Sequence, residues 1–111
     1  AWEDDDSNEN SICLKWNYDF LQNNYPEYNL VKLPMPSKYQ LGDLILPASY
    51  ANFYIANNKV IVPTYGLDTD QVALDTLEPL FPNHKVIGLS AKYLIWGQGS
   101  FHCLSKQEPK V

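Results

Sequence analysis

Apolar residues near the start of the chain recur at intervals of three and four positions, which predicts a helix. Asp6 and Glu9 have the spacing of a capping box, with Asp in place of Ser or Thr, so we expect the helix to begin there. The Asn-Asn-Tyr-Pro sequence at 23–26 is expected to end it. The apolar positions of this helix face are Ile12, Cys13, Trp16 and Phe20.

Alternating or β-branched runs predict strands further along the chain. Residues 28–33 (YNLVKL) alternate and stop at a pair of prolines, which is typical of a short strand. Residues 52–56 (NFYIA) and 59–64 (KVIVPT) are separated by Asn57 and Asn58, which tolerate positive φ and favour a type I′ hairpin. The stretch 34–50 holds three prolines and predicts a long loop, of a length that is often functional.

The last part of the chain predicts a second helix between strands. Asp68 or Thr69 can cap this helix at its start. Residues 85–89 (KVIGL) and 101–106 (FHCLSK) are expected to be strands, and 93–96 to be a strand or a tight turn. The apolar positions expected on the second helix are Ala73, Leu77, Leu80 and Phe81.

The order of these elements places the chain in the α/β class. Residues 51–89 form a ββαβ unit, and residues 1–33 look like the end of a preceding unit of the same kind. A Gly-rich loop and a final strand are expected over 94–109. The 111 residues therefore predict about one and a half repeats belonging to a single domain.

Composition narrows the classes of partner. The net charge is −5, and all eight basic residues are lysines, which argues against binding nucleic acid through its phosphates. No apolar run is long enough to cross a bilayer and no signal peptide is visible, so we expect no membrane partner. Because the sequence begins with Ala rather than Met, we expect a processed product or a piece of a longer protein.

Two cysteines and one Gly-rich segment are the candidates for chemistry. Cys13 and Cys103 are too sparse for a disulfide framework, which predicts free thiols, at least one of them buried, and a cytoplasmic location. Cys103 follows Gly97 and Gly99 and could be a nucleophile, although an apolar strand more often holds a structural cysteine. His102, adjacent along a strand, would point to the opposite face.

The segment 94–109 (LIWGQGSFHCLSKQEP) resembles the C-terminal active-site signature of agmatine deiminases and of the bacterial-type peptidylarginine deiminases grouped with them. That signature has a Gly-rich triplet, then His-Cys and a Gln-rich strand ending in Pro; here Gln98 replaces the middle glycine and Lys106 a glutamine. Other segments similar to the family follow in the right order, and they are 1–5, 31–36, 46–55, 60–66, 80–82 and 86–88.

The resemblance implies a fold and a reaction. The family fold is a pseudo-five-fold α/β propeller of the guanidino-group-modifying superfamily, so residues 1–111 would be the C-terminal portion of one catalytic domain. The family hydrolyses guanidinium groups, which makes agmatine the expected substrate and N-carbamoylputrescine, on the route to putrescine, the expected product. Cys103 would be the nucleophile, and Gly97 and Gly99 would contact the substrate. No metal or organic cofactor is implied.

The resemblance also implies missing partners. The family's acid–base His lies in a Gly-His-x-Asp motif before the segment that corresponds to Ala1, and its substrate carboxylates lie earlier still. We therefore expect the chain to need the N-terminal remainder of its polypeptide and to be inactive alone; the oligomeric state stays open, a homo-oligomer included. The alternatives are a peptidylarginine deiminase of the same family and a small, non-catalytic α/β binding domain.

Overall fold

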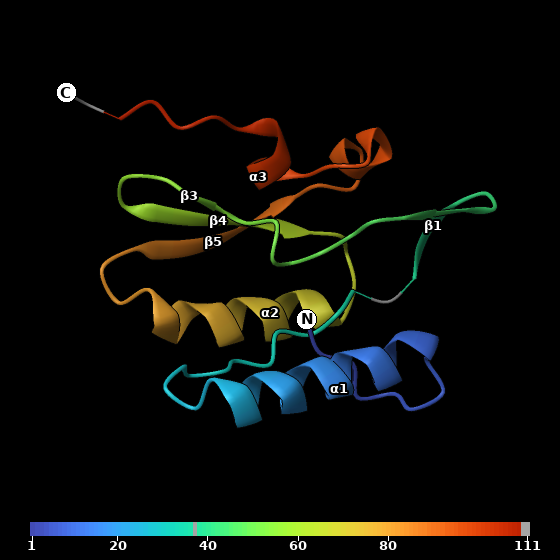
Figure 1. Ribbon diagram of the computed structural model, residues 1–111. Helices are drawn as coiled ribbons and strands as arrows, with labels where there is room; N and C mark the ends of the chain where they lie inside the picture. The colour runs from blue at the N-terminus through green and yellow to red at the C-terminus, as the bar shows by residue number, and fades with distance from the viewer. Residues whose placement is uncertain (37, 110–111) are drawn as a thin grey trace.

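The computed structural model describes residues 1–36 and 38–109, and it has a mixed α/β architecture. A three-stranded sheet is covered on one face by α2, while η2 and α3 lie on its other side (Figure 1). The helices are α1 (Glu9–Asn24), α2 (Thr69–Leu77), η1 (Glu78–Leu80), η2 (Leu94–Gly97) and α3 (Phe101–Leu104). The strands are β1 (Tyr39–Leu41), β2 (Leu44–Leu46), β3 (Tyr54–Ile55), β4 (Lys59–Thr64) and β5 (Lys85–Ser90).

The sheet has the strand order β3-β4-β5. β3 and β4 form an antiparallel hairpin, and β5 runs parallel to β4, with Val60 opposite Val86. A parallel pair needs a crossover, which α2 and η1 provide. The predicted strand–strand–helix–strand order is therefore confirmed, whereas the place of this unit in a five-fold propeller stays a prediction.

The core lies between the sheet and α2 and extends under the loop that follows β5. In central β4, Val60 and Val62 are completely buried and Ile61 is partly buried, because elements cover both faces of this strand. From α2, the predicted positions Ala73 and Leu77 are buried, which confirms this part of the predicted helix face. The prediction is wrong for the other two positions, because Leu80 is exposed in η1 and Phe81 follows η1, where α2 has already ended. The buried core residues are Leu46, Tyr50, Val60, Val62, Tyr65, Ala73, Leu77, Ala91 and Ile95.

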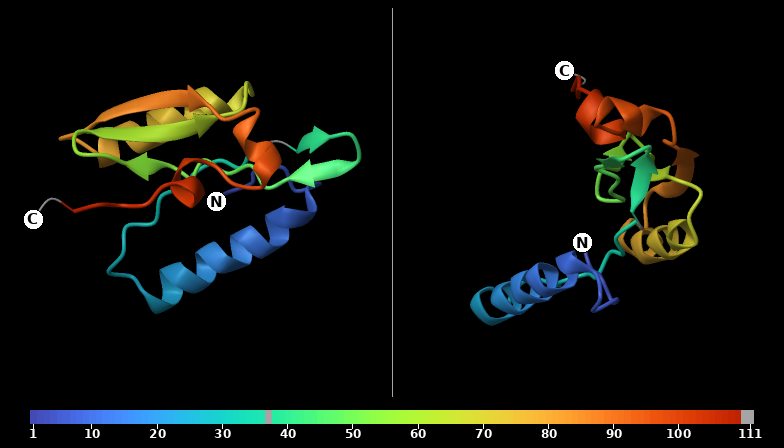
Figure 2. Two further views of the ribbon diagram at one scale, coloured as in Figure 1. Left: turned by 90° about the horizontal axis from the view of Figure 1, so that it is seen from above. Right: turned by 90° about the vertical axis from the view of Figure 1, so that its right-hand side faces the viewer.

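Helix α1 stands apart from the sheet in all three views (Figures 1 and 2). Its N-cap is Asn8, whose side chain accepts a hydrogen bond from the Asn10 backbone N–H, so the predicted Asp6–Glu9 capping box is wrong. The predicted apolar face exists but is not buried: Trp16 is 65% exposed and stacks on Phe20. Among the described residues, no helix is long and apolar enough to cross a membrane.

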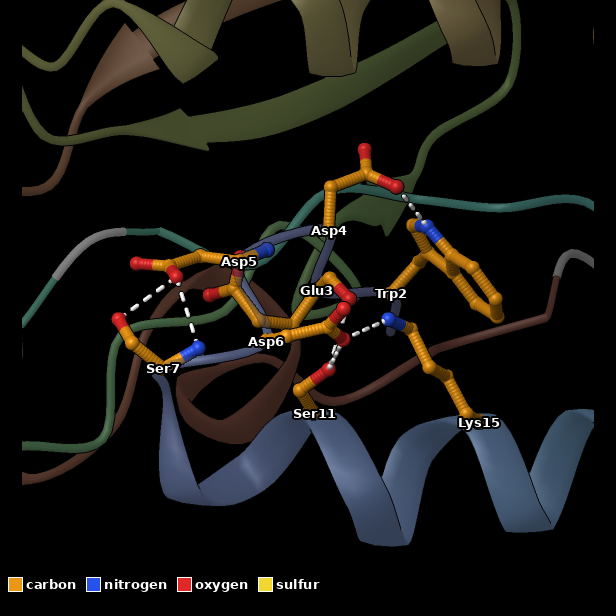
Figure 3. Close-up of polar contacts among 8 residues, drawn as sticks. All are labelled: Trp2, Glu3, Asp4, Asp5, Asp6, Ser7, Ser11 and Lys15. Atoms are coloured by element: carbon orange, nitrogen blue, oxygen red, sulfur yellow. Dashed lines mark hydrogen bonds and ion pairs between the residues drawn. The ribbon is translucent and has the colours of Figure 1, made fainter.

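The acidic run before α1 forms local hydrogen bonds rather than a metal site (Figure 3). Asp4 accepts a hydrogen bond from the Trp2 indole at 2.7 Å. The Ser7 hydroxyl holds the pKa of Asp5 below its ordinary value, and Lys15 does the same for Asp6. Within 1–36 and 38–109 no group of three or more acidic, His or Cys side chains is arranged to hold a metal ion.

Two expectations for the region before β3 are wrong. Residues 28–33, all within the described chain, form no strand; instead Trp2 makes an isolated bridge to Pro34, with its N–H donating to the Leu33 carbonyl. The stretch 34–50 is not simply a loop, because β1 and β2 form a hairpin whose turn places Gly42 at φ 59°, in the left-handed region.

Three further expectations need correction. Asn57 and Asn58 do connect β3 to β4, but neither has positive φ, so the turn is not type I′. Residues 101–106 hold the helical turn α3 in place of the predicted final strand, because a capping interaction described below outweighs the local β propensity. Both cysteines are free and exposed, so the expected buried thiol is also wrong.

We predict that Val62→Ala lowers the free energy of unfolding by about 2 kcal/mol, because Val62 is 0% exposed in the central strand and its loss leaves a cavity. Val72 on α2 is 52% exposed, so Val72→Ala is the matched control and should change stability by less than about 0.5 kcal/mol. Urea unfolding monitored by circular dichroism measures both. Equal costs for the two variants would contradict the assignment of β4 as the core strand.

Candidate functional site at Cys103

The loop after β5 carries Cys103 to the surface. The first half of this loop, residues 91–95, is anchored in the core at both ends, because Ala91 and Ile95 are completely buried. The chain then leaves η2 through Gln98 and enters α3, where Phe101 packs against the core cluster. Cys103 lies in the middle of this single helical turn and is exposed. The loop is therefore fixed by buried apolar contacts while its thiol faces outward.

The two glycines of the loop have different surroundings. A Cβ on Gly99 would lie 3.1 Å from the Cys103 Cβ, so the missing side chain at Gly99 lets the loop approach the cysteine closely. Gly97 has open space around it. Gln98 adopts φ 62°, a conformation that favours glycine, at the position where the resembled signature has one. Contact of Gly97 and Gly99 with a substrate stays a prediction.

A side chain from a distant segment holds Cys103, and sequence reasoning missed it. The Asn52 amide oxygen accepts a hydrogen bond from the Cys103 backbone N–H at 3.1 Å. The amide nitrogen of the same side chain donates to Cys103 Sγ at 2.9 Å. The Asn52 carbonyl also accepts from the His102 N–H at 3.2 Å. These contacts hold both the backbone and the sulfur of Cys103 in a defined direction.

Asn52 also explains why 101–104 is helical. The first N–H groups of a helix need acceptors, and a serine before the helix usually supplies one from its own side chain. Ser100 occupies that position but caps nothing; its hydroxyl is buried and has no hydrogen-bond partner in the described chain. Asn52 satisfies the Cys103 N–H in its place. No pattern local to 101–106 could reveal a cap that comes from residue 52.

Cys103 opens onto a shallow surface hollow. Its lining residues are Ser49, Ala51, Asn52, His102 and Cys103. None of these five is acidic, so the lining of this hollow offers a thiol and a polar amide but no carboxylate. His102 lines the same hollow, although neighbouring positions on a helix do not face each other. His84 lies elsewhere, with its ring edge on Phe81.

Comparison with known proteins identifies the family. Residues 1–109 match the family model for the Porphyromonas-type peptidyl-arginine deiminases. The chain belongs to this family. A relative from Marinomonas recorded as "Putative agmatine deiminase" is 38% identical, over 73% of this chain and 27% of its own length. A Mycoplasma capricolum protein with the same name is 47% identical over 64 residues, which are 58% of this chain and 18% of the relative.

Solved structures of the deiminase family show the same arrangement. A Porphyromonas gingivalis structure described as a "Putative Arginine Deiminase" superposes with a TM-score of 0.90 at 39% identity, over 98% of this chain and 33% of that chain. Agmatine deiminase from C. jejuni gives a TM-score of 0.83 at 33% identity, over 90% of this chain and 30% of its own. The present chain thus spans about a third of these solved relatives and less of the curated ones.

We predict that Asn52→Asp slows alkylation of Cys103 by iodoacetamide roughly tenfold at neutral pH, because a carboxylate replaces the N–H donor beside sulfur. The variant keeps an oxygen for the Cys103 N–H, so α3 retains its cap. Asn57→Asp, in the exposed β3–β4 turn, is the control with the same change in charge. Peptide mass spectrometry follows the rate, with Cys13 as internal reference. Equal rates in both variants would refute the role of the amide.

Proposed function

We propose that this chain is the C-terminal part of an agmatine deiminase and supplies its nucleophile. The proposed reaction converts agmatine and water to N-carbamoylputrescine and ammonia. The observation that carries the proposal is the exposed Cys103 sulfur, which accepts a hydrogen bond from Asn52 within the segment that resembles the family's active-site signature. Relatives named as agmatine deiminases support this choice of substrate.

In the proposed mechanism, the Cys103 thiolate attacks the guanidinium carbon and forms a C–S bond. A C–N bond to one terminal nitrogen then breaks, and ammonia leaves after protonation by a general acid. Water then attacks the same carbon of the remaining amidino-thioether, and a general base and the solvent take up its two protons. The C–S bond breaks, which returns the thiolate and leaves the ureido product. Asn52 contributes by holding sulfur in place and by offering an N–H to its negative charge.

The groups that bind the cation and transfer protons are proposed to lie in the N-terminal remainder of the polypeptide. The hollow beside Cys103 provides no carboxylate from its lining, whereas recognition of a guanidinium needs paired hydrogen bonds to carboxylates. The relatives are about three times as long as this chain, which leaves room for these groups. In this proposal the ββαβ unit is one blade of a pseudo-five-fold propeller that surrounds the completed site.

Peptidyl-arginine is the second candidate substrate. The matching family model is described by that activity. The same chemistry at Cys103 serves both substrates, so the difference must come from contacts with the part of the molecule beyond the guanidinium. Comparing kcat/KM for agmatine and for a blocked arginyl peptide decides between them.

We predict that 2-chloroacetamidine, an amidine with a leaving group, inactivates the complete gene product by alkylating Cys103. Cys103→Ser should abolish labelling at this position and lower kcat by at least roughly 10³-fold, because the nucleophile is lost. Cys13→Ser is the matched control, since Cys13 is also exposed but lies on α1, and it should keep full activity. Mass spectrometry locates the label. Labelling elsewhere, with activity retained in Cys103→Ser, would remove Cys103 from the reaction.

We also predict that the 111-residue chain alone releases no ammonia from agmatine, whereas the complete gene product does. The reason is that no carboxylate lines the hollow beside Cys103, and that His102, which does line it, occupies the neighbouring helical position and does not face Cys103. A coupled ammonia assay measures both. Turnover by the chain alone would refute the proposed division of the site. Inactivity of the complete protein on every guanidine tested would favour the non-catalytic binding domain.

A further inference from the structure

A partly buried polar cluster contacts the segment that carries Asn52, and its centre is the Asp70 carboxylate. Asp70 accepts hydrogen bonds from three consecutive backbone N–H groups in the turn between β4 and α2, at distances between 2.7 and 3.1 Å. The donors are Tyr65, Gly66 and Leu67. Gly66 has φ 75°, which allows the turn to fold around the carboxylate. The turn and the start of α2 are thereby locked together.

Tyr50 connects this turn to the site. Its side chain is 1% exposed, and its hydroxyl donates to Asp70 Oδ1 at 2.7 Å while lying 2.7 Å from the Thr69 hydroxyl. Burial raises the pKa of Tyr50, so the hydroxyl remains a proton donor to the carboxylate. Only Ala51 separates Tyr50 from Asn52 along the chain. The orientation of this short segment is therefore set by residues in the first turn of α2.

Tyr65 fixes the other end of the same segment. Its hydroxyl donates to the Ser49 carbonyl at 3.2 Å and accepts from the Ser49 N–H at 3.1 Å. Ser49 in turn accepts from the Ala51 N–H through its hydroxyl and from the Asn52 N–H through its carbonyl. The segment 49–52 is thus held by backbone hydrogen bonds at Ser49, Ala51 and Asn52 and by the side-chain hydroxyl of Tyr50. Asn52 stands at its end and points its amide at Cys103.

We propose that Asp70 and Tyr50 are positioning residues for Cys103 and act through Asn52. The inference rests on the proposed role of Cys103 as nucleophile. Cys103 is exposed, so core packing does not fix its sulfur; the contacts from Asn52 do. Asn52 is in turn held in register by buried Tyr50, whose hydroxyl donates to Asp70 at the start of α2, and Asp70 also binds the N–H groups of the β4–α2 turn. An error of about 1 Å in such a chain of contacts can cost up to roughly 10²-fold in rate.

The decisive variant is Tyr50→Phe, which keeps the buried ring and removes only the hydroxyl that contacts Thr69 and Asp70. In the complete gene product we expect kcat to fall about tenfold with KM within roughly twofold. Alkylation of Cys103 by iodoacetamide should slow by a similar factor, while alkylation of Cys13 stays unchanged. Asp70→Asn, which removes the charge, should have at least the same effect on Cys103.

A second variant separates positioning from general loss of stability. Val60→Ala removes buried volume from the start of β4, at the opposite end of the strand from the Asp70 turn. It should lower the melting temperature at least as much as Tyr50→Phe but leave kcat and Cys103 alkylation within about twofold of the parent. If Tyr50→Phe leaves Cys103 alkylation and kcat unchanged, the proposal is overturned, whether or not Asp70→Asn folds.

The two readouts also distinguish this inference from the function on which it rests. Slower alkylation of Cys103 in Tyr50→Phe, in a protein whose parent hydrolyses no guanidine, would support the coupling between Asp70 and Cys103 and refute the deiminase reaction. Normal hydrolysis by the parent together with unchanged alkylation in Tyr50→Phe would support the reaction and refute the coupling.

Discussion

One side-chain amide joins the two parts of the chain that make the site. Asn52 and Cys103 are 51 positions apart, yet the Asn52 side chain donates to the Cys103 sulfur and accepts from the Cys103 N–H, and the Asn52 carbonyl accepts from the His102 N–H. This arrangement answers a physical requirement, because a nucleophile must be exposed to meet its substrate and also fixed in direction. Packing in the core would fix the direction of the side chain but would also bury it. Directional hydrogen bonds to a neighbouring segment, which is itself buried on its inner side, fix an exposed side chain without covering it.

The sheet explains why these segments meet. The loop that ends at Cys103 leaves from the carboxyl end of β5, and the turn bound by Asp70 leaves from the carboxyl end of its parallel neighbour, β4. Connections after adjacent parallel strands emerge at one edge of a sheet, which is where α/β proteins commonly place their sites. Tyr50 and Tyr65 fill the space between that edge and the segment 49–52. The core and the site are thus continuous, and the same buried rings serve both.

The sequence predicts the family and most regular elements but not the details of the site. The helices around Trp16 and Ala73 follow from apolar periodicity, and the β3–β4 hairpin from its β-branched runs. The segment 101–106 looks like a strand because its Phe and Cys alternate with polar residues; a cap from residue 52 makes it a helix, and such long-range contacts leave no local signal. The exposure of a helix face cannot be predicted from the sequence either, because periodicity identifies an apolar face on α1 but not whether another segment covers it.

The negative net charge of the chain would attract a cationic substrate at long range but provides no carboxylate at the hollow beside Cys103. A net charge of −5 attracts a guanidinium toward the molecule as a whole. Carboxylates of the acidic run before α1 accept hydrogen bonds from nearby side chains. Asp70 accepts hydrogen bonds from backbone N–H groups and from a tyrosine hydroxyl. None of these groups lines the hollow at Cys103. In this part of the site the thiolate itself would be the negative group that a bound cation meets, so attraction and attack would fall on the same atom. In the proposed reaction, selectivity among cations would then come from carboxylates that the rest of the protein places around that atom.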